Sequence, residues 1–93
     1  MIGGFQDKKL ELFWLEDKRR NIPINIVNVL RNKLNMIAFA EVIEDLRVPP
    51  SNHLEALKGK LEGFYSIRVN KQWRLVFKWH GNYAFNLRLT DYH

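Results

Sequence analysis

The chain has no cysteine and no long apolar segment. Its 93 residues contain no cysteine at all, which excludes a disulfide framework and thiolate chemistry. No run of apolar residues approaches the roughly 18 that a membrane-spanning helix needs. We therefore expect a soluble, cytoplasmic protein with no membrane partner.

Several patterns that carry enzyme chemistry are missing as well. The sequence has no Gly-rich phosphate-binding loop, no serine or cysteine nucleophile motif, and no His, Asp or Glu spacing typical of a metal site. We therefore expect neither a metal nor a cofactor. Repeats, low-complexity segments and linkers are also missing, so residues 1–93 are predicted to form a single domain. With 46% hydrophobic residues, the chain can build one core without disulfides or metal.

Acidic residues are scarce in the C-terminal part of the chain. Residues 1–57 contain eight Lys or Arg and eight Asp or Glu, whereas residues 58–93 contain seven Lys or Arg and two acidic residues. The net charge of +5 therefore comes entirely from the C-terminal part. One-sided basic charge is typical of a domain that binds a phosphate-bearing or acidic partner. A basic surface that only aids solubility is the alternative.

Three stretches of the C-terminal part alternate between two kinds of side chain with the period of a β-strand. They cover residues 64–70, 73–79 and 83–90. One side of each strand is bulky and apolar, and on the last strand this side is predicted to carry Tyr83, Phe85, Leu87 and Leu89. Such a face must be covered, and the helical first half of the chain is the material that can cover it.

Two helices are predicted before the strands. Asp7 can cap a helix over residues 7–20, whose last cations would suit the helix dipole. A second helix is expected from Pro23 to about Leu46, because this segment carries an apolar stripe and is followed by two prolines. Residues 1–5 have the apolar side chains to join the sheet as an edge strand. The predicted fold class is α+β, with two N-terminal helices packed on one face of a mainly antiparallel sheet.

The sheet face turned away from the helices is predicted to be polar and basic. It should carry Ser66, Arg68, Asn70, Arg74, Lys78, Asn86, Arg88, Thr90 and Tyr92. Four of these residues are cations, and like charges side by side on a sheet repel one another. A purely structural origin of this cluster is therefore disfavoured, because a bound polyanion would relieve the repulsion.

Four blocks of the sequence resemble one toxin family. They are LEALKG at Leu54–Gly59, GFYSIR at Gly63–Arg68, NKQWRLVF at Asn70–Phe77, and the C-terminal Asp91-Tyr92-His93. Together with the length and the order of helices before sheet, these blocks are similar to the HigB branch of the RelE/ParE toxin superfamily. The resemblance spans nearly the whole chain. Its most specific parts are the Lys-Gly, Trp-Arg and Asp-Tyr-His blocks, and it implies a RelE-like fold.

The resemblance also implies an activity and partners. A protein of this kind is the toxin of a type II toxin-antitoxin system and a ribosome-dependent endoribonuclease, or mRNA interferase, that cuts messenger RNA. It is held inactive by a HigA-type helix-turn-helix antitoxin. The implied partners are therefore the ribosome, mRNA and such an antitoxin.

Carried over by motif, the resemblance implies a set of site residues. The residues implied to be catalytic are Lys58, Arg74, Tyr92 and His93, and those implied or expected to bind substrate are Arg68, Lys78, Arg88, Asp91 and His53. Certain relatives have a histidine where this chain has Glu55, and His53 stands two residues earlier.

Metal-free cleavage of RNA requires a base for the 2′-hydroxyl proton, cations at the phosphate and an acid for the departing 5′-oxygen. Arg68 and Arg74 suit the phosphate because guanidinium is a planar fork, and Lys58 beside flexible Gly59 could reach the same place. An imidazole such as His93, with a reference pKa of about 6.5, can serve as acid or base near neutral pH. A phenol such as Tyr92, with a reference pKa of about 10, is better suited to orient the substrate or to stack on a base.

The sequence leaves a second function open. A non-catalytic protein of the same fold could be a nucleic-acid-binding module or a ParE-like toxin that acts on DNA gyrase. Lys58 and the Asp-Tyr-His ending favour the RNA-cleaving toxin, because phosphate binding alone does not call for a terminal imidazole beside a phenol.

Overall fold

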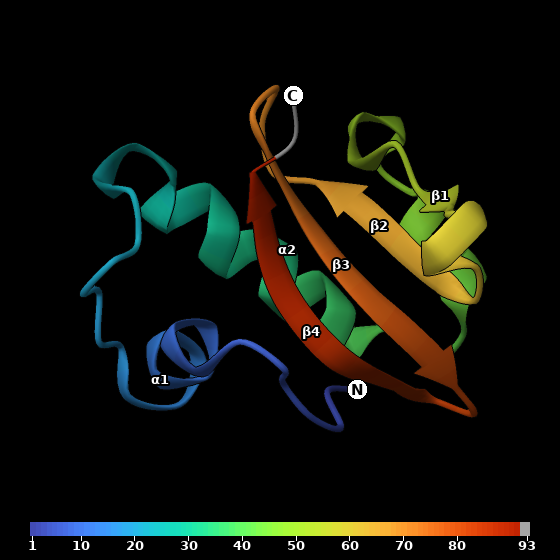
Figure 1. Ribbon diagram of the computed structural model, residues 1–93, viewed down its shortest axis with the longest axis horizontal. Coiled ribbons are helices and arrows are strands. Elements are labelled where there is room, and N and C mark those ends of the chain that lie inside the picture. The colour runs from blue at the N-terminus through green and yellow to red at the C-terminus, as the bar shows by residue number, and fades with distance from the viewer. Residues whose placement is uncertain (92–93) are drawn as a thin grey trace.

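A four-stranded antiparallel sheet lies at the centre of the structure, a computed structural model that describes residues 1–91 (Figure 1). The strands are β1 (Glu55–Ala56), β2 (Phe64–Arg68), β3 (Trp73–His80) and β4 (Tyr83–Asp91). They follow one another across the sheet in chain order, and each pairs with the next. Ile2 and Phe5 form isolated parallel bridges with β4, so the start of the chain joins the edge of the sheet as predicted.

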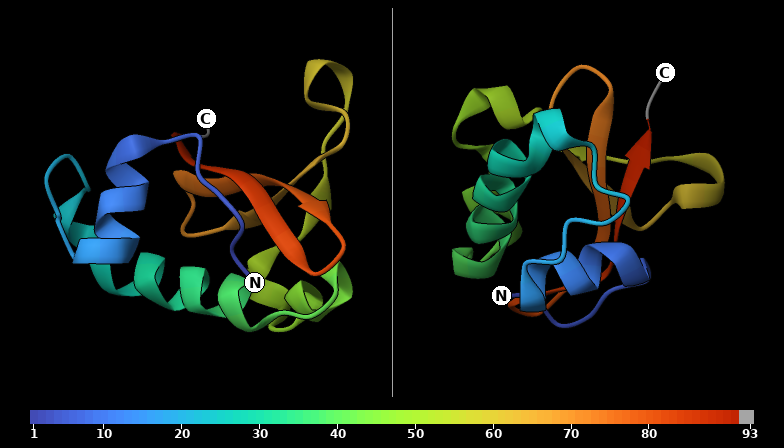
Figure 2. Two further views of the ribbon diagram at one scale, coloured as in Figure 1. Left: turned by 90° about the horizontal axis from the view of Figure 1, so that it is seen from below. Right: turned by 90° about the vertical axis from the view of Figure 1, so that its left-hand side faces the viewer.

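Two helices complete the fold, α1 (Lys8–Glu16) and α2 (Val27–Phe39). Figure 2 shows α2 on one side of the sheet, while α1 lies beside β4. Short 3-10 turns are found at Ile24–Ile26, Ile43–Arg47, Pro50–Asn52 and Gly59–Leu61. None of the helices in residues 1–91 is long and apolar enough to span a membrane.

The core lies between the helices and the sheet. The stripe predicted on the second helix is buried, and it comprises Val27, Leu30, Leu34 and Ile37. It belongs to the same cluster as inward residues of the strands and of α1, namely Ile67, Leu75, Phe77, Leu87, Leu10 and Phe13. Trp73 and Trp79 are partly buried against this cluster. The predicted α+β class is confirmed, and the period of the apolar residues is what made it predictable.

The first helix is shorter than the sequence predicts. It ends at Glu16 because Asp17 adopts a left-handed conformation with a φ of 55°. The N–H groups of Asp17 and Lys18 donate to the carbonyls of Phe13 and Leu12, which closes the last turn. The cations at residues 18–20 therefore lie beyond the helix, and their expected place at its C-terminal dipole is wrong.

The second helix is interrupted where the sequence predicts that it continues. It ends at Phe39, and the chain turns again only at Ile43–Arg47. The carboxylate of Asp45 explains the break, because it accepts hydrogen bonds from the backbone N–H groups of Glu41 at 2.9 Å and Val42 at 3.3 Å. A side chain that bonds to nearby N–H groups in this way competes with the helix for them.

A β-bulge changes the alternation predicted for the last strand. Val76 lies opposite Arg88, but Lys78 lies opposite Phe85, so β4 contains one extra residue at this point. Asn86 accommodates it in a left-handed conformation with a φ of 56°. Asparagine adopts this conformation more readily than most residues.

Because of the bulge, the side chains at the start of β4 lie on the opposite faces from those predicted. Ala84 is fully buried in the core, whereas Tyr83 is 42% exposed. Phe85 lies opposite Lys78, on the sheet face away from α2. The prediction that Tyr83 and Phe85 belong to the core face is therefore wrong.

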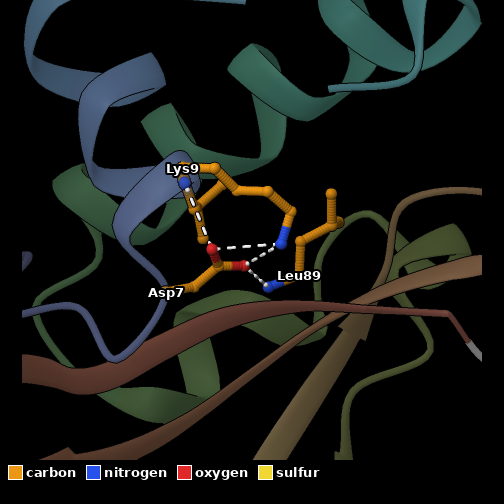
Figure 3. A network of polar contacts seen from close by, with 4 residues as sticks. Asp7, Lys9 and Leu89 are labelled. Atoms are coloured by element: carbon orange, nitrogen blue, oxygen red, sulfur yellow. Dashed lines mark hydrogen bonds and ion pairs between the residues drawn. The ribbon is translucent and has the colours of Figure 1, made fainter. Parts of the chain in front are cut away.

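The carboxylate of Asp7 joins α1 to β4 (Figure 3). As predicted, Asp7 caps the helix, accepting a hydrogen bond from the N–H of Leu10 at 3.4 Å. It also accepts from the N–H of Leu89 at 3.1 Å and pairs with the ammonium of Lys9 at 3.0 Å. One carboxylate thus binds backbone N–H groups that are 79 residues apart in the chain.

A buried lysine supports the segment that leads into β1. The ammonium of Lys33 on α2 donates to the side-chain oxygen of Asn52 at 2.6 Å, and both side chains are buried. The amide of Asn52 donates to the carbonyls of Leu46 at 3.1 Å and Val48 at 3.5 Å. Burial lowers the pKa of Lys33 below its ordinary value of 10.5. These contacts fix the chain just before His53.

Replacing Asp7 by Ala should lower the free energy of unfolding by about 2 kcal/mol, because a helix cap and a partly buried N–H of β4 lose their acceptor. Urea denaturation of the two proteins measures this difference. Glu62→Ala, which removes an exposed carboxylate, is the control and should change little. An equal loss in both variants would show that the Asp7 contacts contribute nothing specific.

Lys33 should make the stability pH-dependent in the alkaline range. Because its pKa is lower in the folded state, the unfolded state binds more protons between that pKa and 10.5, and stability rises with pH in this window. The stability of the wild type relative to Lys33→Met should be constant at lower pH and increase as pH approaches 10.5. Urea denaturation over a pH series, with exposed Lys71→Met as control, tests this. A difference that does not change with pH contradicts it.

Candidate active site

The sheet face turned away from α2 carries the predicted cations. Register places Ser66, Val76 and Arg88 opposite one another across β2, β3 and β4. In the adjacent row, Arg74 lies between Arg68 and Thr90. The alternation of the strands therefore brings these residues to one face, as the sequence predicts.

Arg74 is buried on this face rather than open to solvent. Its Nε donates to the hydroxyl of Ser66 at 2.9 Å. Its Nη2 donates to the carbonyl of His53 at 2.6 Å and lies 3.5 Å from the carbonyl of Ser66. Only 7% of the residue is exposed. The guanidinium therefore extends from β3 across β2 and holds the segment that enters β1.

The face is more covered than the sequence predicts. Ser66 and Val76 are buried as well as Arg74. Ser66 lies beneath the guanidinium, and Phe64 and Arg88 approach each other across Val76, with 5.5 Å between the Arg88 Cζ and the Phe64 ring centroid. Cations with long side chains thus cover apolar and hydroxyl groups on this face.

Lys78 and Arg88 share the ring of Phe64. The ammonium of Lys78 lies 5.0 Å from the ring centroid, a distance typical of a cation–π contact. Phe64 therefore stabilises two like charges that would otherwise only repel each other. Lys78 is exposed and Arg88 is half-buried, so both can contact a ligand.

His53, in the segment before β1, lies beside the cations. Nε2 of His53 is 3.4 Å from Nη1 of Arg68, which brings the predicted His53 into the site. His53 adopts a left-handed conformation with a φ of 45°, which orients its carbonyl to accept from Arg74. Because arginine only donates, a hydrogen bond between these two atoms requires the tautomer of His53 whose Nε2 accepts.

Glu55 was not among the residues expected from the sequence to bind substrate or to act in catalysis. It pairs with Ser66 in β1, and its carboxylate Oε1 lies 3.8 Å from Nη2 of Arg74. The side chain is 52% exposed. Phe64 was missed as well. Phe64 could have been found, because it is two residues from Ser66 and therefore lies on the same side of the predicted strand. Glu55 could not, because a strand as short as β1 shows no periodicity.

Lys58 and Asp91 are placed less centrally. Lys58 is exposed in the segment between β1 and the turn at Gly59–Leu61, which projects from the sheet on the side away from α2 (Figure 2). Asp91 lies opposite Trp73, on the other face from Arg74, and accepts a hydrogen bond from the side chain of Gln72 at 3.2 Å. Tyr92 and His93 lie outside the described residues.

Relatives of known identity match this chain along its whole length. Toxin HigB-1 of Vibrio cholerae is 50% identical over 93 residues, which cover 99% of this chain and 98% of that protein. Endoribonuclease HigB of Proteus vulgaris is 32% identical over 93 residues, which cover all of both proteins.

Solved structures share the fold. YafQ from Escherichia coli superposes with a TM-score of 0.65 at 16% identity, covering 98% of this chain and 93% of YafQ. A chain of the YoeB-YefM toxin-antitoxin complex from Staphylococcus aureus gives 0.60 at 23% identity and covers 100% and 98%. Residues 3–93 match the family described as the RelE-like toxin of the type II toxin-antitoxin system HigB. The chain therefore belongs to the HigB family of RelE-like type II toxins.

Proposed function

We propose that this toxin is an endoribonuclease that cuts messenger RNA on the ribosome, in the cytoplasm, by metal-independent acid-base chemistry. The main observation in support is the cluster of cations on one sheet face, where Arg74 is fixed by hydrogen bonds and shares the face with Arg68, Lys78 and Arg88. The name of the Proteus vulgaris relative, an endoribonuclease, agrees with this proposal.

The cations suit the charge that develops during RNA cleavage. As the 2′-oxygen attacks, negative charge builds on the phosphate, and donors that are already oriented stabilise it without reorganising. Arg74 is such a group, because its hydrogen bonds and burial fix its position. Arg68 and exposed Lys58 can bind the same phosphate or its neighbour, and Lys78 and Arg88 extend the cationic surface along the RNA.

The proton transfers require titratable groups near these cations. In this proposal His93 and Tyr92 act at the scissile bond, while His53 and Asp91 contribute to substrate binding. The position of His53 beside Arg68 supports its part. Asp91 is at the end of β4, directly before the two C-terminal residues, and would act from the edge of the site.

A type II toxin has an antitoxin as its partner, and we propose that this one is of the HigA type, with a helix-turn-helix domain. In one arrangement, an acidic segment of the antitoxin covers the cationic face. In the other, the antitoxin contacts the helices on the opposite side of the sheet. Occlusion predicts that the complex weakens as salt increases. Measuring the affinity of toxin for antitoxin across salt concentrations distinguishes the two arrangements. An affinity that does not change with salt contradicts occlusion of the cationic face.

Translation of a defined message with the purified toxin tests the proposed activity. New 5′ ends should appear in the translated message and not in the same message without ribosomes. His93→Ala should reduce their formation by about 10²-fold or more, the usual contribution of one acid or base. Lys58→Ala should also reduce it, and exposed Lys71→Ala is the matched control.

The absence of new ends with folded wild-type toxin would contradict the proposal and favour a non-catalytic protein of the same fold. New ends in the ribosome-free sample would retain the nuclease activity but contradict the ribosome dependence.

A further inference from the structure

We propose that Tyr83 and Phe85 form a stacking site for the bases of single-stranded messenger RNA, with Tyr83 as the exposed contact. This inference rests on the proposed function and names residues that bind the substrate away from the cleaved bond. It starts from the β-bulge in β4, because the bulge places two aromatic rings on the sheet face that carries Arg74.

The strand register places both rings on this face. Phe85 lies opposite Lys78, and Tyr83 lies opposite His80 in the next row. Residues that face each other on neighbouring strands project to the same side of the sheet. Lys78 and His80 are an even number of residues from Arg74 along β3, so they project to the same side as Arg74. The two rings therefore lie on the face that we propose binds RNA.

This face changes from cationic to mixed cationic and aromatic along β3. In the row of Lys78, the neighbours are Phe64 on β2 and Phe85 on β4, so the lysine lies between two aromatic residues. Arg74 and His80 are six residues apart on β3, which corresponds to about 20 Å in a strand. β3 and β4 run side by side over this length (Figure 1). The face can therefore contact several nucleotides beyond a phosphate bound at Arg74.

The N-terminal segment holds the two rings in place. The N–H of Gly3 donates to the carbonyl of Ala84 at 2.7 Å, and the N–H of Ala84 donates to the carbonyl of Met1 at 2.8 Å. The ring of Phe85 packs so closely on Gly3 that a Cβ there would lie 2.5 Å from its Cε1. Tyr83 lies against this ring, with 6.1 Å between the centroids and 40° between the planes. Little ordering of the rings is therefore needed when a base binds, which favours affinity.

Tyr83 keeps enough exposed surface to contact a base, because 42% of the residue is exposed. Proteins bind single strands by combining cations, which contact the phosphates, with aromatic rings, on which the bases stack. An acidic segment of a protein partner could pair with Lys78 but has no planar base to stack on Tyr83. RNA is therefore the occupant that uses both parts of the surface.

Binding of a single strand that cannot be cut measures the stacking. The probes are a 2′-O-methyl oligoadenylate, which has no free 2′-hydroxyl, and the same sugar-phosphate chain without bases. Tyr83→Leu should weaken binding of the oligoadenylate by about tenfold or more, the usual contribution of one stacked base, and should not change affinity for the baseless chain. Tyr83→Phe should bind like the wild type because it keeps the ring. Phe39→Leu, which removes an exposed ring at the end of α2, is the matched control and should also bind like the wild type.

Each other result overturns the inference. One is wild-type affinity of Tyr83→Leu for the oligoadenylate. Another is an equal loss for both probes, because a ring cannot stack on a chain without bases. A third is a wild type that binds the oligoadenylate no more tightly than the baseless chain. If Tyr83→Leu does not fold, Tyr83→Thr, which also lacks a ring and suits a strand, decides in its place.

The binding experiment is separate from the test of the proposed function, because neither probe can be cut. A toxin that cuts a translated message while Tyr83→Leu binds the oligoadenylate normally retains the proposed function and loses the stacking site. A toxin that stacks the oligoadenylate through Tyr83 but leaves the message intact retains the stacking site and loses the proposed function.

Discussion

The hydrogen bonds of the buried Arg74 guanidinium hold the candidate site together. They connect β3 to Ser66 on β2 and to the carbonyl of His53, so three segments of the chain meet at one charged group. A buried charge is costly unless it is hydrogen-bonded, and here the acceptors are a hydroxyl and backbone carbonyls. Within residues 1–91, the carboxylate of Glu55 lies 3.8 Å from it. The guanidinium is therefore held rigidly, which suits the phosphate-binding role that we propose for it.

The segment that Arg74 holds is also supported from the helix side. Lys33 on α2 binds Asn52, and the next residue, His53, supplies the carbonyl to Arg74. The segment before β1 thus lies between two buried cations, one from each layer of the fold. Because His53 belongs to it and Glu55 begins β1 two residues later, the position of the candidate site depends on contacts that reach through the core. A substitution at Lys33 can therefore affect the site without touching a substrate.

The sequence predicted the features that depend on periodicity and missed those that depend on a single side chain. The stripe on α2 and the strands β2 and β3 follow from apolar spacing, and the cap at Asp7 follows from its chemistry. The helix break at Asp45 and the bulge at Asn86 each come from one residue that offers the backbone an alternative conformation. The periodicity of the sequence does not indicate such a residue. For this reason Phe85, which lies beyond the bulge, was assigned to the wrong face.

The same limit applies to the candidate site. The two-residue period of the strands predicted that one face carries Arg68, Arg74, Lys78 and Arg88. The strand register confirms this prediction. The period could not show that the guanidinium of Arg74 donates to Ser66, because this requires knowing which strand is its neighbour. The position of Glu55 beside Arg74 could not be predicted for a similar reason. Its strand has only two residues, and its position beside Arg74 comes from pairing with β2.

The central claim is that this face activates a 2′-hydroxyl of RNA, and replacing that one group tests it most directly. A message with a single 2′-deoxynucleotide on the 5′ side of a mapped cleavage position would be translated with the toxin, beside the all-ribose message. The account predicts that the cut at this bond disappears while cuts at other positions remain, because the nucleophile is gone but the phosphate and its binding are unchanged. Equal cutting of the deoxy-substituted bond would contradict it, since a nucleophile other than the 2′-hydroxyl would then be at work.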